Sequence, residues 1–324
     1  MELRPLLSIL ADGAFHSGEQ IGRDLSISRT AVWKQVDKLR GLGVDIHSVT
    51  GKGYRLPAAI DLLDSQQILA HLGIDGERCR QELSVEFSTV STNKDALEAA
   101  QRGRGSGIFV AEYQSQGRGR RGRTWVSPAG SNIYFSMLVT FSRGVAELEG
   151  LSLAVAVMVV KALNASGYSG FSLKWPNDVL RDGRKVAGIL LEITGDVAGP
   201  CKIVIGIGIN ARISATLKKG VDQPVGDLAE GTSAVPDRNR IVANLIRELH
   251  QGIAEFESLR FEGFKEQWEA IDAYKGQLVR IGGNGDWVEG RVLGVNSKGA
   301  LQLQTADGHK CVAGGELAPS VRSL

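Results

Sequence analysis

The sequence predicts an α+β protein of three units, whose middle unit is a mixed, mostly antiparallel sheet with helices on one face. Three observations support this fold class. Two serines that can cap helices mark a short helical segment near the start, and from about residue 62 apolar strand-like runs alternate with long amphipathic helices. The residues from Tyr274 onward hold only short strands between glycine-rich turns, as in a small β-barrel. We therefore expect units at 1–60, 62–272 and 274–324.

The composition is that of a globular protein and argues against several classes of function. Hydrophobic residues make up 43% and charged residues 23% of the 324, so a sizeable core can be buried. A formal net charge of +2 is too small to indicate a nucleic-acid binder unless a local patch carries that role. The widely spaced Cys79, Cys201 and Cys311 argue against a disulfide framework or zinc site. With no signal-peptide pattern and no apolar run longer than Leu153 to Val160, we expect a cytoplasmic protein without a membrane partner.

The first unit has the pattern of a helix-turn-helix. Ser17 and Ser28 are placed to cap two short helices. Val32, Val36 and Leu39 repeat at helical spacing and should face inward, which turns polar and basic residues of the second helix toward solvent. The positions predicted to meet DNA are Ser28, Arg29, Thr30, Trp33, Lys34 and Lys38, together with Lys52 of the hairpin that follows.

That hairpin is predicted from Val44 to Leu56, with Gly51-Lys52-Gly53 at its turn, and would form the wing of a winged helix-turn-helix. From Arg29 to Arg55 six basic residues stand against two acidic ones, so the charge bias is local and positive. Any helical hairpin can show this pattern by chance, and that alternative stays open beside the DNA-binding interpretation. Residues 57–61 are expected to be the linker.

The second unit is predicted from alternating strand and helix patterns. A long segment, 212–236, has no clear periodicity, and loops of that length are usually functional or disordered. Strands are expected near Val85 to Val90, Ile108 to Tyr113, Asn132 to Phe141, Phe171 to Lys174, Val179 to Arg181, Lys185 to Ile193 and Cys201 to Ile209, and helices over Thr92 to Arg102, Leu148 to Ser166, Asp237 to Ser258 and Phe261 to Ile271.

The stretch from Gly117 to Trp125, GRGRRGRTW, is the strongest candidate for a binding site. Four arginines offer permanent charge and planar forks, and three glycines let backbone N–H groups approach a ligand, so the expected ligand is anionic. Its match to the dinucleotide pattern G-x-G-x-x-G is weak, because Ser127-Pro128 follows where a helix should begin. A solvated basic loop is the alternative.

Four further motifs in this unit carry polar groups at strand or helix ends. Residues 174–178, KWPND, offer amide and carboxylate oxygens at a turn, and KVAGILLE at 185–192 starts an apolar strand with a lysine. In GIGIN at 206–210 alternate glycines leave one strand face without side chains, so something other than ordinary core should fill it. Ser91-Thr92-Asn93 either caps a helix or reaches a ligand.

In this order the motifs resemble the bifunctional biotin-protein ligases that also repress the biotin operon. The resemblance covers nearly the whole chain and is carried by HSGEQIG, SRTAV, STN, GRGRRGRTW, KWPNDV, KVAGILLE, GIGIN and the C-terminal strands. It implies a class II synthetase-like central unit and an SH3-like C-terminal barrel. The chain departs from the family at Val90, where an acidic residue usually precedes the STN motif.

The resemblance implies two chemical steps. Biotin and ATP, with Mg2+, would give biotinyl-5'-AMP and pyrophosphate, and the adenylate would then acylate a lysine of a biotin carboxyl carrier protein. No tightly bound metal is implied. The other implied partners are operator DNA and, once biotinyl-5'-AMP is bound, a second copy of the chain.

The resemblance also assigns roles to single residues. Lys185, Arg118 and Arg120 would be catalytic, because they would hold the biotin carboxylate and the α-phosphate together. Biotin would be bound by Ser91, Thr92, Asn93, Gln114, Gly117, Arg118, Arg120, Lys185, Gly188, Gly206 and Gly208. The nucleotide would be bound by Arg120, Arg121, Arg123, Trp125 stacked on adenine, Asn177, Lys185 and Asn210, with Asp178 near the metal.

Two other functions remain open on the sequence. A ligand-sensing repressor without ligase activity would share the fold, but it would not need Lys185 beside Asp178 and the arginine loop. A lipoate-protein ligase performs the same adenylation on a related fold, but such sequences lack the RGRRGR loop and the N-terminal helix-turn-helix.

Overall fold

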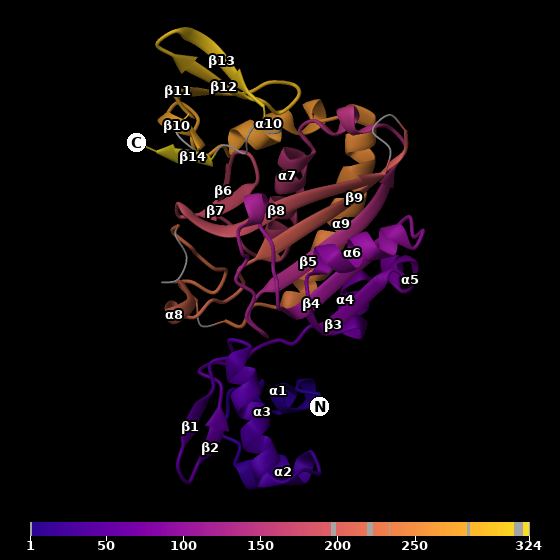
Figure 1. The fold of residues 1–324 in the computed structure, drawn as a ribbon, viewed down its shortest axis with the longest axis vertical. Coiled ribbons are helices and arrows are strands. Elements are labelled where there is room, and N and C mark those ends of the chain that lie inside the picture. The colour runs from indigo at the N-terminus through magenta and orange to yellow at the C-terminus, as the bar shows by residue number, and fades with distance from the viewer. Residues whose placement is uncertain are drawn as a thin grey trace.

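A computed structural model of the chain describes residues 2–195, 199–218, 223–232, 234–283, 286–313 and 320–323. Three units follow one another along its long axis (Figure 1). A small helical unit with a two-stranded hairpin lies at one end, a large twisted sheet with helices fills the middle, and a small all-β unit lies at the other end. The order of units along the chain is the one the sequence predicts.

The first unit contains the two predicted helices and the predicted hairpin, preceded by a further helix. They are α1 (Arg4–Leu10), α2 (Gly18–Asp24), α3 (Arg29–Gly41), β1 (His47–Val49) and β2 (Gly53–Arg55). The Ser17 and Ser28 hydroxyls accept hydrogen bonds from the backbone N–H groups of Gln20 and Ala31, so both serines cap their helices. Leu6, Leu7 and Leu10 of α1 and the predicted inward residues of α3 form one fully buried core.

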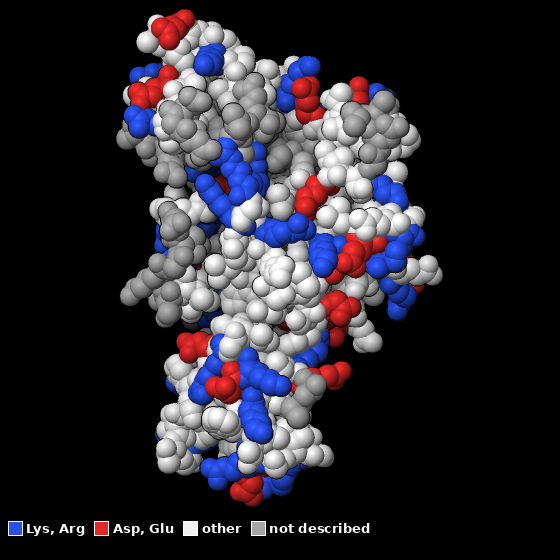
Figure 2. All heavy atoms as spheres, in the orientation of Figure 1, with Lys and Arg blue, Asp and Glu red and all other residues white. Residues whose placement is uncertain are grey.

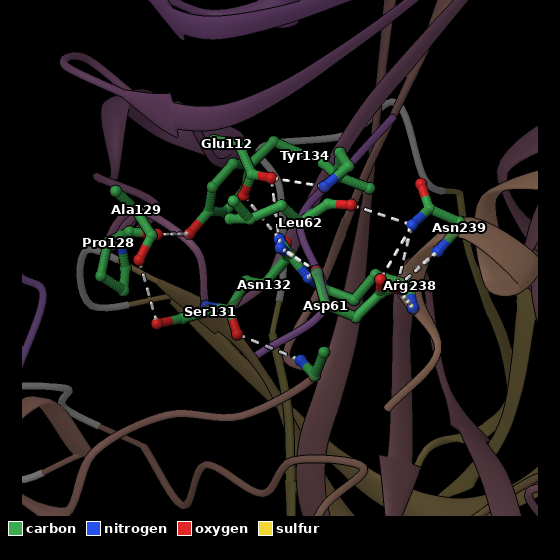
Figure 3. A network of polar contacts seen from close by, with 12 residues as sticks. Asp61, Leu62, Glu112, Pro128, Ala129, Ser131, Asn132, Tyr134, Arg238 and Asn239 are labelled. Carbon is green, nitrogen blue, oxygen red and sulfur yellow. Dashed lines mark hydrogen bonds and ion pairs between the residues drawn. The ribbon is translucent and has the colours of Figure 1, made fainter. Parts of the chain in front are cut away.

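The linker is held firmly to the central unit by buried polar groups (Figure 3). The Asp61 carboxylate accepts hydrogen bonds from the backbone N–H groups of Arg238 and Asn239, and the Asp61 carbonyl accepts from the Arg238 guanidinium. Arg238 also forms a buried ion pair with Glu112, at 2.8 Å. Because Glu112 also accepts from the Leu63 N–H, the chain that leaves the first unit is fixed where it enters the second.

The central sheet has seven strands in the order β3-β4-β5-β9-β8-β7-β6. Only β3 and β4 are parallel, so the sheet is mixed and mostly antiparallel, as predicted. The strands are β3 (Leu83–Thr89), β4 (Gly107–Gln114), β5 (Ile133–Phe141), β6 (Phe171–Lys174), β7 (Asp178–Arg181), β8 (Arg184–Gly195) and β9 (Cys201–Ile209).

Helices cover both faces of this sheet, whereas the sequence predicts helices on one face. The large core lies between one face and α7 (Leu151–Ala165), α9 (Arg238–Leu259) and α10 (Glu262–Ala270). The helix α6 (Thr92–Gln101) packs on the opposite face, where Ala96 and Ala99 contact Phe109, Leu138 and Val204. Two helices that the sequence analysis missed, α4 (Ser65–Leu72) and α5 (Ile74–Cys79), follow the linker.

The last unit is a five-stranded antiparallel sheet in the order β13-β12-β11-β10-β14. In the described part of the chain this sheet does not close, so the expected barrel is corrected to an open sheet. Trp175 next to β6 donates through Nε1 to the Gly299 carbonyl at 3.0 Å, which fastens this unit to the central one. The strands are β10 (Leu278–Gly283), β11 (Asp286–Val295), β12 (Leu301–Thr305), β13 (Gly308–Val312) and β14 (Ser320–Ser323).

Short elements complete the chain: the 3-10 turns η1 (Arg120–Gly122) and η2 (Val145–Leu148), and the helix α8 (Ala215–Lys218). Among the described residues, none of the helices combines the length and apolarity needed to cross a membrane.

Candidate functional site

A cavity opens on the sheet face that α6 covers in part, beyond the N-terminal end of that helix. Its empty volume is about 480 Å³, a figure that includes open solvent at its mouth. Strands β4, β5, β8 and β9 form its floor, and the arginine loop and the 177–178 turn border it. Its lining residues are Ser91, Thr92, Asn93, Gln114, Arg118, Gly119, Arg120, Trp125, Tyr134, Phe135, Asn177, Lys185, Gly188, Ile189, Leu190, Gly206, Ile207 and Gly208.

The arginine loop folds back on itself and does not open a helix, in agreement with the weak dinucleotide match. The Trp125 N–H donates to the Gly117 carbonyl at 2.9 Å, and the Gly119 N–H donates to the Arg123 carbonyl at 2.7 Å. Arg121 takes a left-handed conformation with φ of 57° at the tip. This geometry turns the loop into a short flap at the cavity mouth.

Two of the four arginines line the cavity. Arg120 donates to Asn177 Oδ1 at 3.3 Å, and its burial lowers the pKa of its guanidinium while the nearby Asp178 opposes that shift. Arg118 forms an ion pair with Glu192 of β8 at 3.6 Å. Arg121 and Arg123 are exposed and do not line the cavity, so a nucleotide contact for them stays a prediction.

Lys185 and Asp178 form a close ion pair at the edge of the cavity, with Nζ 2.6 Å from Oδ1. Their side chains are 14% and 12% exposed, so the pair is largely removed from water. Lys185 Nζ also lies 5.4 Å from the centre of the Trp125 ring, within range of a cation–π contact. The lysine is therefore a fixed and partly desolvated cation, not one extended into solvent.

The backbone of Lys185 is fixed by a strap from the long loop, residues 223–230. The Lys185 N–H donates to the Pro224 carbonyl, and the Gly226 N–H donates to the Lys185 carbonyl, both at 3.0 Å. A register shift between β7 and β8 next to Lys185 accompanies this arrangement, and such bulges redirect side chains beside active sites. Asn210 donates to the carbonyls of Lys185 and Gly226 and does not line the cavity, so its predicted nucleotide contact remains untested.

The glycine-lined strand face is filled by two polar or aromatic side chains. A Cβ at Gly206 would lie 2.1 Å from Asn93 Oδ1, and one at Gly208 would lie 2.4 Å from the Trp125 ring. Gly188 leaves room for Trp125 and Lys185 in the same way. The sequence expectation that something other than core fills this face is correct, and the structure identifies what fills it beside the cavity.

Of the remaining predicted biotin-site residues, Ser91, Thr92 and Gln114 line the cavity with polar groups, and Gly117 does not. Ser91 occupies the N-cap position of α6, but its side chain makes no capping hydrogen bond, which favours the ligand-facing alternative. Gln114 Oε1 accepts from the Thr92 N–H at 3.0 Å, and Gln114 Nε2 donates to the Ser127 hydroxyl at 3.1 Å. Gly117 does not line the cavity, but a Cβ there would lie 2.4 Å from Ser127 Oγ, so only glycine fits.

Sequence reasoning missed two polar residues under the cavity, Glu192 and Ser136. Glu192 accepts from Asn93 Nδ2 at 2.6 Å, and Ser136 is fully buried between Thr92 and Asn93. A signal for Glu192 existed: it follows Gly188 and Leu190 at strand spacing on an otherwise apolar strand, so it had to face the cavity side.

The described residues offer little to hold a metal by themselves, since they contain no group of three or more His, Cys, Asp or Glu with suitable spacing. Two carboxylates lie near the arginines: Asp178 is close to Arg120 and pairs with Lys185, and Glu192 pairs with Arg118. Mg2+ usually keeps waters and binds through one or two carboxylates plus substrate phosphates. These residues therefore fit an ion that arrives with a nucleotide, with Asp178 as one ligand.

The predicted DNA-binding residues are all exposed, on α3, on the residue that caps it and in the hairpin turn. Trp33 is 54% exposed, which is unusual for a tryptophan without a partner. Basic side chains gather over this unit and again over the face that carries the arginine loop (Figure 2). Ser28, Arg29, Thr30, Lys34, Lys38 and Lys52 are all exposed.

Three family models match the chain in the order of its units. An HTH domain matches residues 3–55, the biotin/lipoate A/B protein ligase family matches residues 87–210, and a biotin protein ligase C terminal domain matches residues 275–317. Together they cover the residues predicted to bind DNA, the cavity and most of the small sheet.

Individual proteins agree with these matches. The chain is 38% identical to the bifunctional ligase/repressor BirA of Escherichia coli over 97% of this chain and 95% of that protein. It is 30% identical to the protein of the same name from Bacillus subtilis over 93% of this chain and 92% of that one. Among solved structures, the biotin protein ligase from Aquifex aeolicus in complex with biotin and ATP is 29% identical, with a TM-score of 0.64, covering 75% of this chain and 100% of that chain.

Proposed function

The chain belongs to the family of bifunctional biotin ligase/repressors, and we propose on that basis that it adenylates biotin, transfers it to a carrier protein and represses transcription. The biotin carboxylate attacks the α-phosphorus of ATP, which forms biotinyl-5'-AMP and releases pyrophosphate. The amine of a carrier lysine then attacks the acyl carbon, which forms an amide and releases AMP. The observation that carries the ligase proposal is the Lys185–Asp178 pair beside Arg120 at the mouth of a small-molecule cavity.

The first step joins two anions, and the positive groups around the cavity reduce their repulsion. Arg118 and Arg120 lie at the mouth, where they can hold the carboxylate and phosphate oxygens through paired N–H donors. Lys185 lines the same cavity and would bridge the carboxylate to the α-phosphate. Charge held in place before the reaction costs no reorganisation at the transition state, and one such group is typically worth about 3 kcal/mol.

The surroundings of Lys185 suit that role. Asp178 orients the ammonium group, and the 223–230 strap fixes the backbone from the other side. Mg2+ enters as part of the nucleotide substrate and would neutralise phosphate charge, with Asp178 and Asn177 nearby. Trp125 Nε1 is buried without a hydrogen-bond partner in the described part of the chain, so its indole has a donor as well as a face to offer the adenylate.

The same molecule carries a surface for DNA. Helix-turn-helix units commonly bind paired half-sites as dimers, and one small domain with a modest basic face has limited affinity alone. We therefore propose that repression requires a dimer and that biotinyl-5'-AMP favours it. Binding of the adenylate shifts this equilibrium only by its differential affinity for the two states, and couplings of about 1 to 3 kcal/mol are usual. Sedimentation with and without biotinyl-5'-AMP tests this: an unchanged monomer–dimer equilibrium and unchanged operator affinity would refute the coupling alone.

The ligase proposal is tested by mass spectrometry of the protein incubated with ATP, biotin and a carrier domain. A mass increase of the carrier by one biotinyl group, with pyrophosphate release that depends on biotin, is the expected result. The matched incubation with lipoate separates the two acids. Biotin-dependent DNA binding without pyrophosphate release would instead support a sensor that lacks ligase activity.

A further inference from the structure

A chain of short hydrogen bonds runs beneath the cavity and ends on a carboxylate. Asn93 Nδ2 donates to Glu192 Oε2 at 2.6 Å. Asn93 Oδ1 lies 2.6 Å from the Ser136 hydroxyl, which in turn lies 2.7 Å from the Thr92 hydroxyl. Asn93, Ser136 and Thr92 are each at most 5% exposed, so the bonds among these three residues are shielded from water. Thr92 lines the cavity, whereas Glu192 and Ser136 are not among its lining residues.

The carboxylate fixes the direction of every bond in this chain. An ionised Glu192 can only accept, so Asn93 must turn its NH2 group toward it and its oxygen toward Ser136. That oxygen is an acceptor, so the single hydroxyl proton of Ser136 is used on it. The 2.7 Å contact between Ser136 and Thr92 then needs the Thr92 proton, because two oxygens without a proton between them would repel. The free lone pair of Thr92 is left facing the cavity as an acceptor.

Gln114 is fixed from the other side of the cavity. The Ser127 hydroxyl donates to the Trp125 carbonyl at 2.8 Å, so Ser127 can only accept from Gln114 Nε2. The oxygen of Gln114 therefore faces Thr92, whose N–H it accepts at 3.0 Å. The Thr92 hydroxyl could alternatively donate to this oxygen, but at 3.2 Å that contact is longer than the one to Ser136. Both side chains thus present acceptors to a ligand.

We propose that Glu192 is a specificity-determining positioning residue for the adenylation reaction. Through Asn93 and Ser136 it holds Thr92 as a hydrogen-bond acceptor, so that the pocket selects an acid whose head group presents an N–H donor. A cyclic urea such as that of biotin presents two such donors, while a dithiolane presents none. The identity of the acid rests on the proposed function, whereas the direction of the hydrogen bonds rests on Glu192 itself.

The test uses full-length Glu192→Gln and two biotin analogues, in each of which a ring oxygen replaces one ureido N–H. The neutral amide that replaces the carboxylate can donate or accept, so Asn93 is free to turn and Thr92 to become a donor. Dissociation constants are measured by titration calorimetry. In the unmodified protein we expect one analogue to bind at least about a hundredfold more weakly than biotin. In that analogue the ring oxygen would face the Thr92 hydroxyl oxygen, and both atoms are hydrogen-bond acceptors.

In the variant the two ligands should respond in opposite directions. We expect biotin to bind about fivefold more weakly and that analogue about fivefold more tightly, so that their ratio falls by tenfold or more. Release of Arg118 from Glu192 cannot produce this result, because both ligands carry the same carboxylate. The proposal would be overturned if the ratio of the two affinities were the same in the variant as in the unmodified protein. It would also be overturned if biotin and the analogue both bound more weakly to the variant.

Two further variants make the test specific. Ser136→Ala removes the relay but keeps the charge of Glu192, so it should lower the same ratio, and the double variant should lower it no further. Glu86→Gln makes the identical chemical change at an exposed position of β3 and should leave the ratio unchanged. Biotin-dependent pyrophosphate release by the unmodified protein is measured first: its absence would refute the proposed function, while its presence with an unchanged ratio in both variants would refute this inference alone.

Discussion

Asp272 provides a direct test of how burial controls stability in this chain. It follows α10, where its backbone lies beside Leu173 of β6 at the junction with the small sheet. The Tyr274 N–H donates to Oδ1 at 2.9 Å, while Oδ2 is buried and has no hydrogen-bond partner among the described residues. Burial raises the pKa of this carboxyl from 3.8 to about 6, against smaller opposing effects of Tyr274 and Lys275. We predict that Asp272→Asn stabilises the protein at neutral pH.

The magnitude follows from that shift. The pKa rises by about 2.2 between the unfolded and folded states, and at 1.36 kcal/mol per unit the ionised group costs at most about 3 kcal/mol. The folded state binds the proton more tightly, so the stability of the unmodified protein falls as the pH rises from about 4 to 6 and is then level. The advantage of Asp272→Asn should therefore be about 3 kcal/mol at pH 7.5 and roughly half of that at pH 5.

Urea unfolding followed by near-ultraviolet circular dichroism at the two pH values measures this difference. The asparagine oxygen can still accept from Tyr274, so the variant removes the charge and keeps the hydrogen bond. Asp307→Asn, in an exposed turn of the small sheet, is the matched control and should show no such pH-dependent gain. A variant no more stable than the parent at pH 7.5 would refute the reasoning that desolvation dominates at this site.

The other predictions concern the proposed chemistry and the unit boundary. Lys185→Ala should lower pyrophosphate release by about a hundredfold or more and should also lower the melting temperature, because Asp178 is left buried without its cation; near-normal turnover would remove this lysine from the mechanism. Arg120→Gly should release the adenylate early, which is seen as biotinylation of bystander proteins; complete loss of synthesis would place Arg120 in the chemistry itself. A truncated chain that begins at Ile60 should fold and lose operator binding. A chain that begins at Leu62 should melt at a lower temperature, because it lacks the contacts that Asp61 makes with Arg238. Equal melting temperatures of the two truncated chains would show that the Asp61 contacts contribute little to stability.

Local patterns in the sequence are enough to predict most elements of the fold. Ser17 and Ser28 cap helices because a hydroxyl meets an unpaired backbone N–H only a few residues away. The alternation of apolar residues in strands likewise depends only on neighbouring residues. The helix α4 was missed although Asp64 caps it with two hydrogen bonds, because its apolar residues are too few for a clear period.

The packing of helices against the central sheet was harder to predict, because it depends on which face of the sheet each helix covers. Nothing in the alanines of α6 tells which side of the sheet they cover, and the structure places them opposite α7 and α9. The position of the last sheet depends on contacts such as that of Trp175 with Gly299. Such contacts join residues far apart in the chain, so no window of sequence contains them.

For the candidate site, too, some features follow from the sequence and others only from the tertiary structure. The sequence by itself determines which chemical groups are available, since it specifies the arginines, Lys185 and the alternate glycines whatever the fold. The tertiary structure alone decides that Asn93 and Trp125 fill the glycine face, that Asp178 and Glu192 supply the negative charge missing from the arginine loop, and that Asn210 holds backbone. The physical reason is that the direction of a hydrogen bond and the cost of burying a charge depend on atoms brought together from distant strands.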